Sequence, residues 1–232
     1  MASSFTLADT PALDDLQVFL ARAARIEEGS VRLIADSGVL AVYAAVFYPV
    51  GLLDESPTVL GLRTIALVQP EGAAPAEFDV VVPIRSLLGR LKTAQEARQA
   101  DPSLVGPITI SVPMEVNTVT WSAISPPRGG WRPIDGTGAA LLDRAARSGI
   151  EEVAAAVPDA VGEQIVRRVR SEVWSRGIVG LEHVPAGAAF AALGLGFLGE
   201  DEVRMFETGP WTRLTTQRGH VLVKRKAWTL SR

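Results

Sequence analysis

The sequence contains no cysteine, so disulfide frameworks, thiolate nucleophiles and cysteine zinc sites are excluded. It has only two histidines, His183 and His220, and neither lies in the H-E-x-x-H or H-x-x-H spacing of a metal site. A G-x-S-x-G nucleophile elbow and a Walker A loop are also missing. We therefore lean towards a protein that is not an enzyme, with no catalytic residue, metal or cofactor. Serine hydrolysis with one histidine as the base stays open.

Long hydrophobic runs are missing too. A long uncharged run covers residues 38–53, and Pro49 and Gly51 interrupt it. That run is shorter than the roughly 20 residues that a membrane-spanning helix needs. The start of the chain has no basic segment followed by an apolar one, as a secretory signal would have. We expect a cytoplasmic protein without membrane contact.

Positive and negative charges nearly balance over the whole chain, but basic residues are in excess in its last stretch. The net charge is −3, which predicts neither non-specific electrostatic binding of nucleic acid nor an acidic tail. Residues 201–232, however, carry seven basic and three acidic side chains. The rest of the chain is therefore acidic on balance.

Apolar residues recur at helical spacing in some segments and alternate in others, which indicates helices and strands. The predicted helices cover residues 10–26, 83–91, 138–147, 150–174 and 186–193. The predicted strands cover residues 31–35, 39–48, 58–68, 78–82, 108–112, 117–125, 203–206, 211–216 and 220–226. Strands come in groups rather than in strict alternation with helices, which favours an α+β fold.

The order of these elements predicts three regions. We expect a mainly antiparallel sheet with packing helices in the N-terminal half, then a helical segment, then a C-terminal antiparallel meander. The length of 232 residues fits a single domain over residues 10–232, with possible subdomains 10–135 and 136–232. Residues 1–9 are expected to form a loose tail, and residues 94–107 a loop or frayed helix. No internal repeat is visible in the sequence.

The first predicted hairpin suggests self-association. Asp36, Ser37 and Gly38 separate its strands, and three residues ending in glycine suit a type I turn with a G1 bulge. The second strand, residues 39–48, is apolar on both faces and is therefore expected in the centre of the sheet. Helices would cover one face, and a second subunit is one candidate for the other.

The segment S-P-P-R-G-G-W at residues 125–131 is the most distinctive of the chain. Its two prolines exclude a helix interior or a sheet ladder, and its two glycines permit a φ angle that other residues resist. Such a rigid corner would hold Arg128 and Trp131 in fixed directions. Arg128 could then clamp a carboxylate or phosphate, with Trp131 as an apolar wall.

Two other patterns have an ordinary structural interpretation. Residues 194–199 match G-x-G-x-x-G, but a predicted helix precedes them and Glu200, Asp201 and Glu202 follow, whereas a dinucleotide site needs a strand before it and a helix after it. We interpret them as a glycine helix cap and loop. Arg167, Arg168 and Arg170 form a basic cluster on a predicted helix; Glu163 precedes Arg167 by four residues and Glu172 follows Arg168 by four, which predicts a solvated helix face with surface ion pairs.

The C-terminal strands mix aromatic and cationic side chains, as a generic nucleic-acid platform does. The candidates for such binding are Arg218, Lys224 and Lys226. Trp211, Arg213 and His220 join Arg128 and Trp131 as candidates for ligand binding. However, Arg213 and Arg218 could instead pair with Glu207 or with acids of the N-terminal half, and tryptophan on a strand is more often core or interface. Nucleic-acid binding is therefore not favoured.

Several short motifs resemble a family of actinobacterial proteins of unknown function. They are the P-P-x-x-G-W corner at residues 126–131, G-F-L at 196–198, W-T-R-L at 211–214 and R-G-H-V-L at 218–222. The resemblance implies a small, stand-alone cytoplasmic protein. It implies no activity, substrate or catalytic residue.

Three functions follow from these patterns. We favour a non-enzymatic interaction or scaffolding protein that forms a homodimer, because reactive side chains are few and scattered. The first alternative is a small anionic-ligand-binding protein or enzyme with a pocket near Arg128 and Trp131. The second alternative is nucleic-acid binding through the basic C-terminal sheet.

Overall fold

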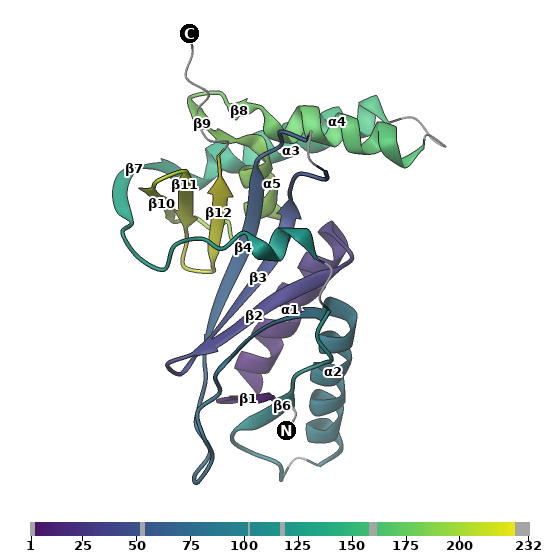
Figure 1. Ribbon diagram of the computed structural model, residues 1–232, viewed down its shortest axis with the longest axis vertical. Helices are drawn as coiled ribbons and strands as arrows, with labels where there is room; N and C mark the ends of the chain where they lie inside the picture. The colour runs from purple at the N-terminus through teal and green to yellow at the C-terminus, as the bar shows by residue number, and fades with distance from the viewer. Residues whose placement is uncertain (1–2, 52–53, 102, 117–118, 158–161, 226–232) are drawn as a thin grey trace. The chain divides into compact units, whose positions relative to one another are not determined.

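The chain combines helices with a mainly antiparallel sheet, which confirms the predicted α+β class (Figure 1). The computed structural model describes residues 3–51, 54–101, 103–116, 119–157 and 162–225. Contacts group the chain into two compact units, one of Met1–Ala44 with Leu62–Ala123 and one of Ala45–Gly61 with Ile124–Arg232. This grouping is discontinuous in sequence, unlike the predicted subdomains 10–135 and 136–232.

The first unit packs two helices against antiparallel strands. Along the chain it holds β1 (Ser4–Leu7), α1 (Thr10–Ile26), β2 (Ser30–Asp36), the start of β3 (Val39–Phe47), the end of β4 (Thr58–Ala66), β5 (Phe78–Pro83), α2 (Ile84–Ala100), β6 (Ile108–Ser111) and the 3₁₀ helix η1 (Thr120–Ala123). The strand order is β5-β2-β3-β4, and β1 pairs separately with β6. The helices α1 and α2 lie side by side, so leucines of both are buried (Figure 1).

The second unit contains the end of β3, the start of β4 and the C-terminal meander. Its other elements are β7 (Arg132–Gly138), α3 (Ala139–Ala156), α4 (Glu163–Ser175), β8 (Gly177–Ile178), β9 (Leu181–Pro185), α5 (Ala186–Gly194), β10 (Glu202–Thr208), β11 (Trp211–Thr215) and β12 (His220–Lys224). The strand order is β4-β12-β11-β10-β7, and β8 pairs with β9. The predicted C-terminal meander is therefore confirmed, and α5 packs on α3.

Both units use one pairing scheme. Each has a strand–helix–three-strand module, which is β1-α1-β2-β3-β4 in the first unit and β9-α5-β10-β11-β12 in the second. Each also has a module in which one or two helices connect two strands, β5-α2-β6 in the first unit and β7-α3-α4-β8 in the second. In both units the two modules pair twice, through β2–β5 and β1–β6 or through β10–β7 and β9–β8. The two modules come in opposite order along the chain in the two units. The similarity between the units is therefore not visible as an internal repeat of the sequence.

The first hairpin is tighter than predicted. Asp36 pairs with Val39, so the turn contains only Ser37 and Gly38. Both have positive φ, 51° and 76°, as a type I′ turn requires. The predicted three-residue turn with a G1 bulge is therefore wrong. A two-residue I′ turn matches the twist of the strands more closely.

The apolar strand β3 is covered within its own chain. Leu40, Val42 and Ala44 are buried, while Ala41 and Tyr43 on the other face are half-buried. This pattern places β3 centrally, between β2 and β4, as predicted. Burial of its first face needs no second subunit.

Three segments differ in part from their predicted structure. Residues 4–7, expected in a tail, form β1, because Phe5 and Leu7 are buried when β1 pairs with β6. Of the predicted loop or frayed helix at residues 94–107, the part up to Ala100 continues helix α2, since it consists of strong helix formers, although no residue after Leu91 in this helix is fully buried. Residues 120–123 are a 3₁₀ helix instead of part of a strand, and a strand, β7, follows the proline corner directly. Residues 117 and 118 lie outside the described residues.

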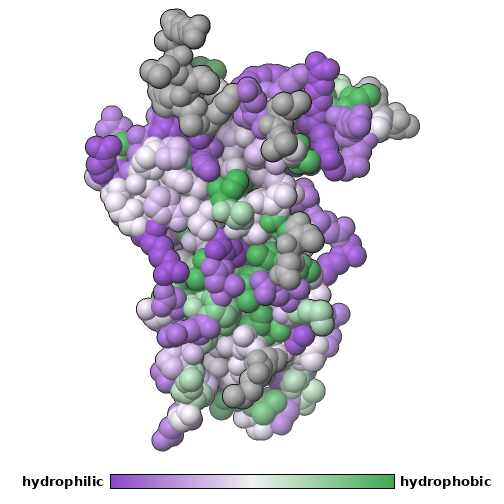
Figure 2. All heavy atoms as spheres, viewed as in Figure 1, coloured by the Kyte–Doolittle hydropathy of each residue, from purple (hydrophilic) through white to green (hydrophobic). Residues whose placement is uncertain are grey.

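The helical segment also differs in detail. Helix α3 runs through Ser148 and Gly149, where an end was predicted, because the ring of Trp174 packs where a side chain at Gly149 would lie. In α4, Ile165 is exposed and only Val173 of the predicted apolar stripe is fully buried; Val161 lies outside the described residues. The visible surface near α4 is largely hydrophilic (Figure 2). The expected surface ion pairs, Arg167–Glu163 and Arg168–Glu172, are present.

The glycines after α5 form a helix end, as the sequence indicated. Gly196 has a φ of 73°, and its N–H bonds to the carbonyl of Leu193, while the N–H of Phe197 bonds to that of Ala192. This is the arrangement of a glycine helix cap. No helix in the described parts of the chain has the length and apolarity to cross a membrane.

Candidate functional site

The proline corner points Trp131 towards the C-terminal sheet. Gly130 has a φ of 77°, a conformation that favours glycine, so the chain turns sharply just before the tryptophan. The indole Nε1–H of Trp131 donates to the carbonyl of Pro127, at 3.0 Å. Backbone and side chain of the corner thus fix one another. Trp131 is half-buried, whereas Arg128 is exposed.

Arg213 contacts two aromatic rings. Its guanidinium carbon is 4.6 Å from the centre of the Trp131 ring and 4.5 Å from that of Phe206. The contact with Phe206 follows from sheet register, since Phe206 on β10 is paired directly with Arg213 on β11. Cation–π contacts of this kind contribute about 0.5–2 kcal/mol each, more when the charge is shielded from water. We call these three residues the Arg213 cluster.

The charge of Arg213 is not balanced within the described part of the chain. Its side chain makes no hydrogen bond or ion pair there, and its Nε is buried without a partner. Burial lowers the pKa of Arg213, and the nearby positive charge of Arg204 lowers it further. The neighbouring carboxylate of Glu207 instead binds Arg225, at 3.0 Å.

The other predicted site residues are not gathered at this cluster. Trp211 is buried and pairs across the sheet with the half-buried Lys224, and His220 lies 3.1 Å from the hydroxyl of Thr215 through its Nδ1. The exposed Arg218 donates to the carbonyl of Leu198. Lys226 lies outside the described residues.

Sequence reasoning named Trp131 and Arg213 separately but missed Phe206 and Arg204. A strand pattern shows which residues share a face, yet only the register shows which residue of the neighbouring strand lies opposite. Arg204 and Phe206 alternate with the buried Val203 and Met205, so their outward direction was visible in the sequence. Their position beside Arg213 was not.

Residues able to hold a metal ion are not clustered. No group of three or more histidine, aspartate or glutamate side chains is close enough among the described residues. His183 is exposed on β9.

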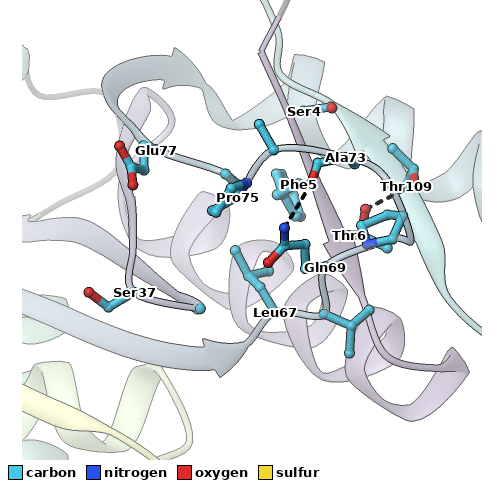
Figure 3. Close-up of a pocket in the computed structure, with 15 residues that line it drawn as sticks. Ser4, Phe5, Thr6, Ser37, Leu67, Gln69, Ala73, Pro75, Glu77 and Thr109 are labelled. Carbon is cyan, nitrogen blue, oxygen red and sulfur yellow. Dashed lines mark hydrogen bonds between the residues drawn. The ribbon is translucent and has the colours of Figure 1, made fainter.

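A separate hollow lies in the first unit and was not predicted. It has a volume of about 520 Å³ and is lined by β1, the β2–β3 turn and the loop after β4. In Figure 3, Glu77 and Ser37 lie on one side, Thr6 and Thr109 on the other, and Phe5 and Gln69 between them. The side chain of Gln69 donates to the carbonyl of Ala73, which closes the loop over the hollow. The lining has one carboxylate and no cation, so it does not suit an anionic ligand.

Two family models match the chain. Residues 1–110 match a domain of unknown function (DUF8010), and residues 126–228 match another (DUF8185). No curated protein matches the sequence. The resemblance to actinobacterial proteins stays a prediction.

Among solved structures, bacterial DNA polymerase sliding clamps are similar. The clamp from Bacillus subtilis has a TM-score of 0.50 at 10% identity, over 100% of this chain and 67% of the clamp chain. The DNA polymerase III subunit beta from Pseudomonas aeruginosa has a TM-score of 0.48 at 14% identity, over 98% of this chain and 66% of that one. This chain thus spans about two thirds of the length of such clamps. At these identities the likeness concerns the fold alone.

Proposed function

We propose that this chain is a non-enzymatic interaction protein whose contact surface is the Arg213 cluster. The observation that supports the proposal is the uncompensated cation in contact with two aromatic rings at a half-exposed position. Tryptophan and arginine are enriched among the residues that dominate the binding energy of protein interfaces. A sheet and a hydrogen-bonded corner hold the cluster rigidly, so little conformational entropy is lost on binding.

As a finer part of this proposal, the protein forms a homodimer through the outer edge of β7. Among the described residues, this strand lies at the end of the sheet of the second unit and pairs on one side only, with β10. An edge strand presents unpaired backbone N–H and C=O groups, which can bind the edge of a second chain.

Light scattering at increasing micromolar concentration tests the homodimer. We expect twice the mass of one chain, and slower amide exchange in β7 at high concentration than at low. The turn at residues 216–219 serves as the internal control, since its exchange should not depend on concentration. A monomer mass at every concentration would remove the homodimer but not the contact surface.

A small anionic ligand bound by Arg128 and Trp131 is the first alternative. Both residues belong to the same corner, and Arg128 is exposed. Thermal-shift measurements with anionic metabolites would show stabilisation that Arg128→Ala removes. A response that Arg128→Ala leaves intact would argue against this alternative.

Nucleic-acid binding through the last sheet is the second alternative. It would weaken steeply with salt, because each phosphate contact releases counterions. The double substitution Lys224→Ala with Lys226→Ala should then reduce binding to an oligonucleotide. Unchanged binding would rule the alternative out.

A further inference from the structure

Arg213 bears a positive charge that its surroundings do not neutralise. The two rings contact the guanidinium group, but they offer no acceptor for its N–H groups, which lie in the guanidinium plane. The charged neighbour that affects its pKa is Arg204, another cation. A half-buried charge without an acceptor is costly unless a ligand supplies one.

The geometry defines how such a ligand would approach. The rings of Trp131 and Phe206 both lie close to the guanidinium carbon, and the Nε is enclosed. An incoming acceptor would therefore meet the two terminal nitrogens end on. A carboxylate fits this fork with two parallel hydrogen bonds, and the ring of Trp131 offers an apolar surface beside it.

We propose that the Arg213 cluster binds the carboxylate side chain of an acidic, aromatic-containing segment of a partner protein. Arg204 adds a second, exposed cation on the same face of β10 for a neighbouring acid. This inference rests on the proposed function, because it names the partner chemistry of that contact surface.

The charges around the cluster favour a short acidic peptide over a nucleic acid. Arg225, which directly follows β12, is already bound to Glu207. Glu202 lies two residues before Arg204, on the same side of β10, and Asp201 is exposed next to it. A continuous row of phosphates would meet these acids, whereas one or two carboxylates would not.

The test measures binding of two matched peptides to the full chain by NMR. The probe is acetyl-Glu-Phe-Glu-Phe-Glu-amide, and its control is the same peptide with glutamine in place of each glutamate. We expect saturable shifts of the Trp131 indole N–H and the Arg213 Nε–H resonances, with the acidic peptide binding at least about 10-fold more tightly. Equal binding of the two peptides, or no saturable shift, overturns the proposal.

Two substitutions and one competing ligand sharpen the result. Arg213→Lys keeps the charge but loses the planar fork, so it should weaken the acidic peptide at least about 5-fold. Arg218→Ala is the matched control and should change nothing. If Arg213→Lys binds as tightly as the wild type, or a short oligothymidylate binds more tightly than the acidic peptide, the proposal is wrong.

The outcome separates this inference from the homodimer. A dimer that does not bind the acidic peptide removes only the inference. A monomer that binds the peptide, with loss in Arg213→Lys, supports the inference and removes only the homodimer. Because the peptide comparison uses the unaltered protein, it stays decisive even where a variant fails to fold.

Discussion

The ring of Trp174 on α4 fills the space that a side chain at Gly149 on α3 would need. A Cβ atom added to Gly149 would lie 2.3 Å from the Cζ3 atom of Trp174. The helix therefore keeps a glycine in its interior although alanine is the better helix former. Trp174 also stacks on Phe190 of α5, with ring centres 4.5 Å apart, so the ring cannot easily give way.

We predict that Gly149→Ala lowers the free energy of unfolding by about 1–2 kcal/mol, because the clash outweighs the gain in helix propensity. Gly89→Ala is the matched control. Gly89 is exposed within α2, and nothing lies within 4 Å of an added Cβ. It should raise the free energy of unfolding by about 0.5–1 kcal/mol. Urea unfolding of both variants checks the pair, and a stabilised Gly149→Ala would contradict the packing.

The β2–β3 turn gives a second prediction. Gly38→Ala should destabilise the fold by about 1–2 kcal/mol, because a Cβ is disfavoured at a φ of 76°. Ser37→Asn should stabilise it by about 0.5 kcal/mol, since asparagine accepts the left-handed conformation more readily than serine. Thermal unfolding of both variants measures the two shifts. Equal effects of the same sign would speak against a type I′ turn.

Arg213 and Arg225 both have a buried Nε without a partner among the described residues, but they should respond differently to removal of their charge. Arg213→Met is expected to change stability by less than about 1 kcal/mol, because the loss of two cation–π contacts is offset by removal of an unsatisfied donor, and no ion pair is lost. Arg225→Met should lower it by about 1 kcal/mol, since Glu207 then loses its partner. Urea unfolding decides between them. Strong destabilisation by Arg213→Met would show that Arg213 is structural.

A fourth prediction concerns acid stability. Burial raises the pKa of Asp54, but hydrogen bonds from the Ser56 side chain and from the backbone N–H groups of Val50 and Ser56 outweigh it, so the pKa lies below its ordinary value of 3.8. The folded state thus favours the charged form. Its contribution is present above pH ~4–5 and is lost as the pH falls through the lowered pKa.

Asp54→Asn should accordingly be less stable than the wild type near pH 7, and the difference should vanish at low pH. The urea midpoint measured from pH 7 down to pH 3 gives this difference directly. Ser103→Ala is the comparison, because it removes the hydrogen bond from the Ser103 hydroxyl to Asp101 in a separate loop. Its effect on the urea midpoint shows how much a comparable exposed turn contributes to stability. A constant difference at all values of pH would rule out the charge as the cause.

Much of the fold could be predicted because the spacing of apolar residues along the chain indicates helices and strands locally. The alternation of apolar and polar residues at 108–111 predicted a strand, and the helical spacing of apolar residues in α1 predicted a helix. Each pattern also indicated which face is buried. Burial contradicted the local signal elsewhere. From the local sequence, Gly149 predicts a helix end, but it lies inside a helix because Trp174 packs against it. The residues of β1 look like a tail in the sequence, but they form a strand because they pair with β6.

The sequence by itself determined the α+β class, the central place of β3 and the helix cap at Gly196, because these depend on period, composition and backbone freedom. It also named Trp131 and Arg213 as candidates. Only the tertiary structure decided that these two residues contact one another, that Phe206 also contacts Arg213, and that Glu207 forms an ion pair with Arg225. The physical reason is that a strand's period sets which face a residue occupies, whereas its neighbours across the sheet depend on register between segments distant in sequence.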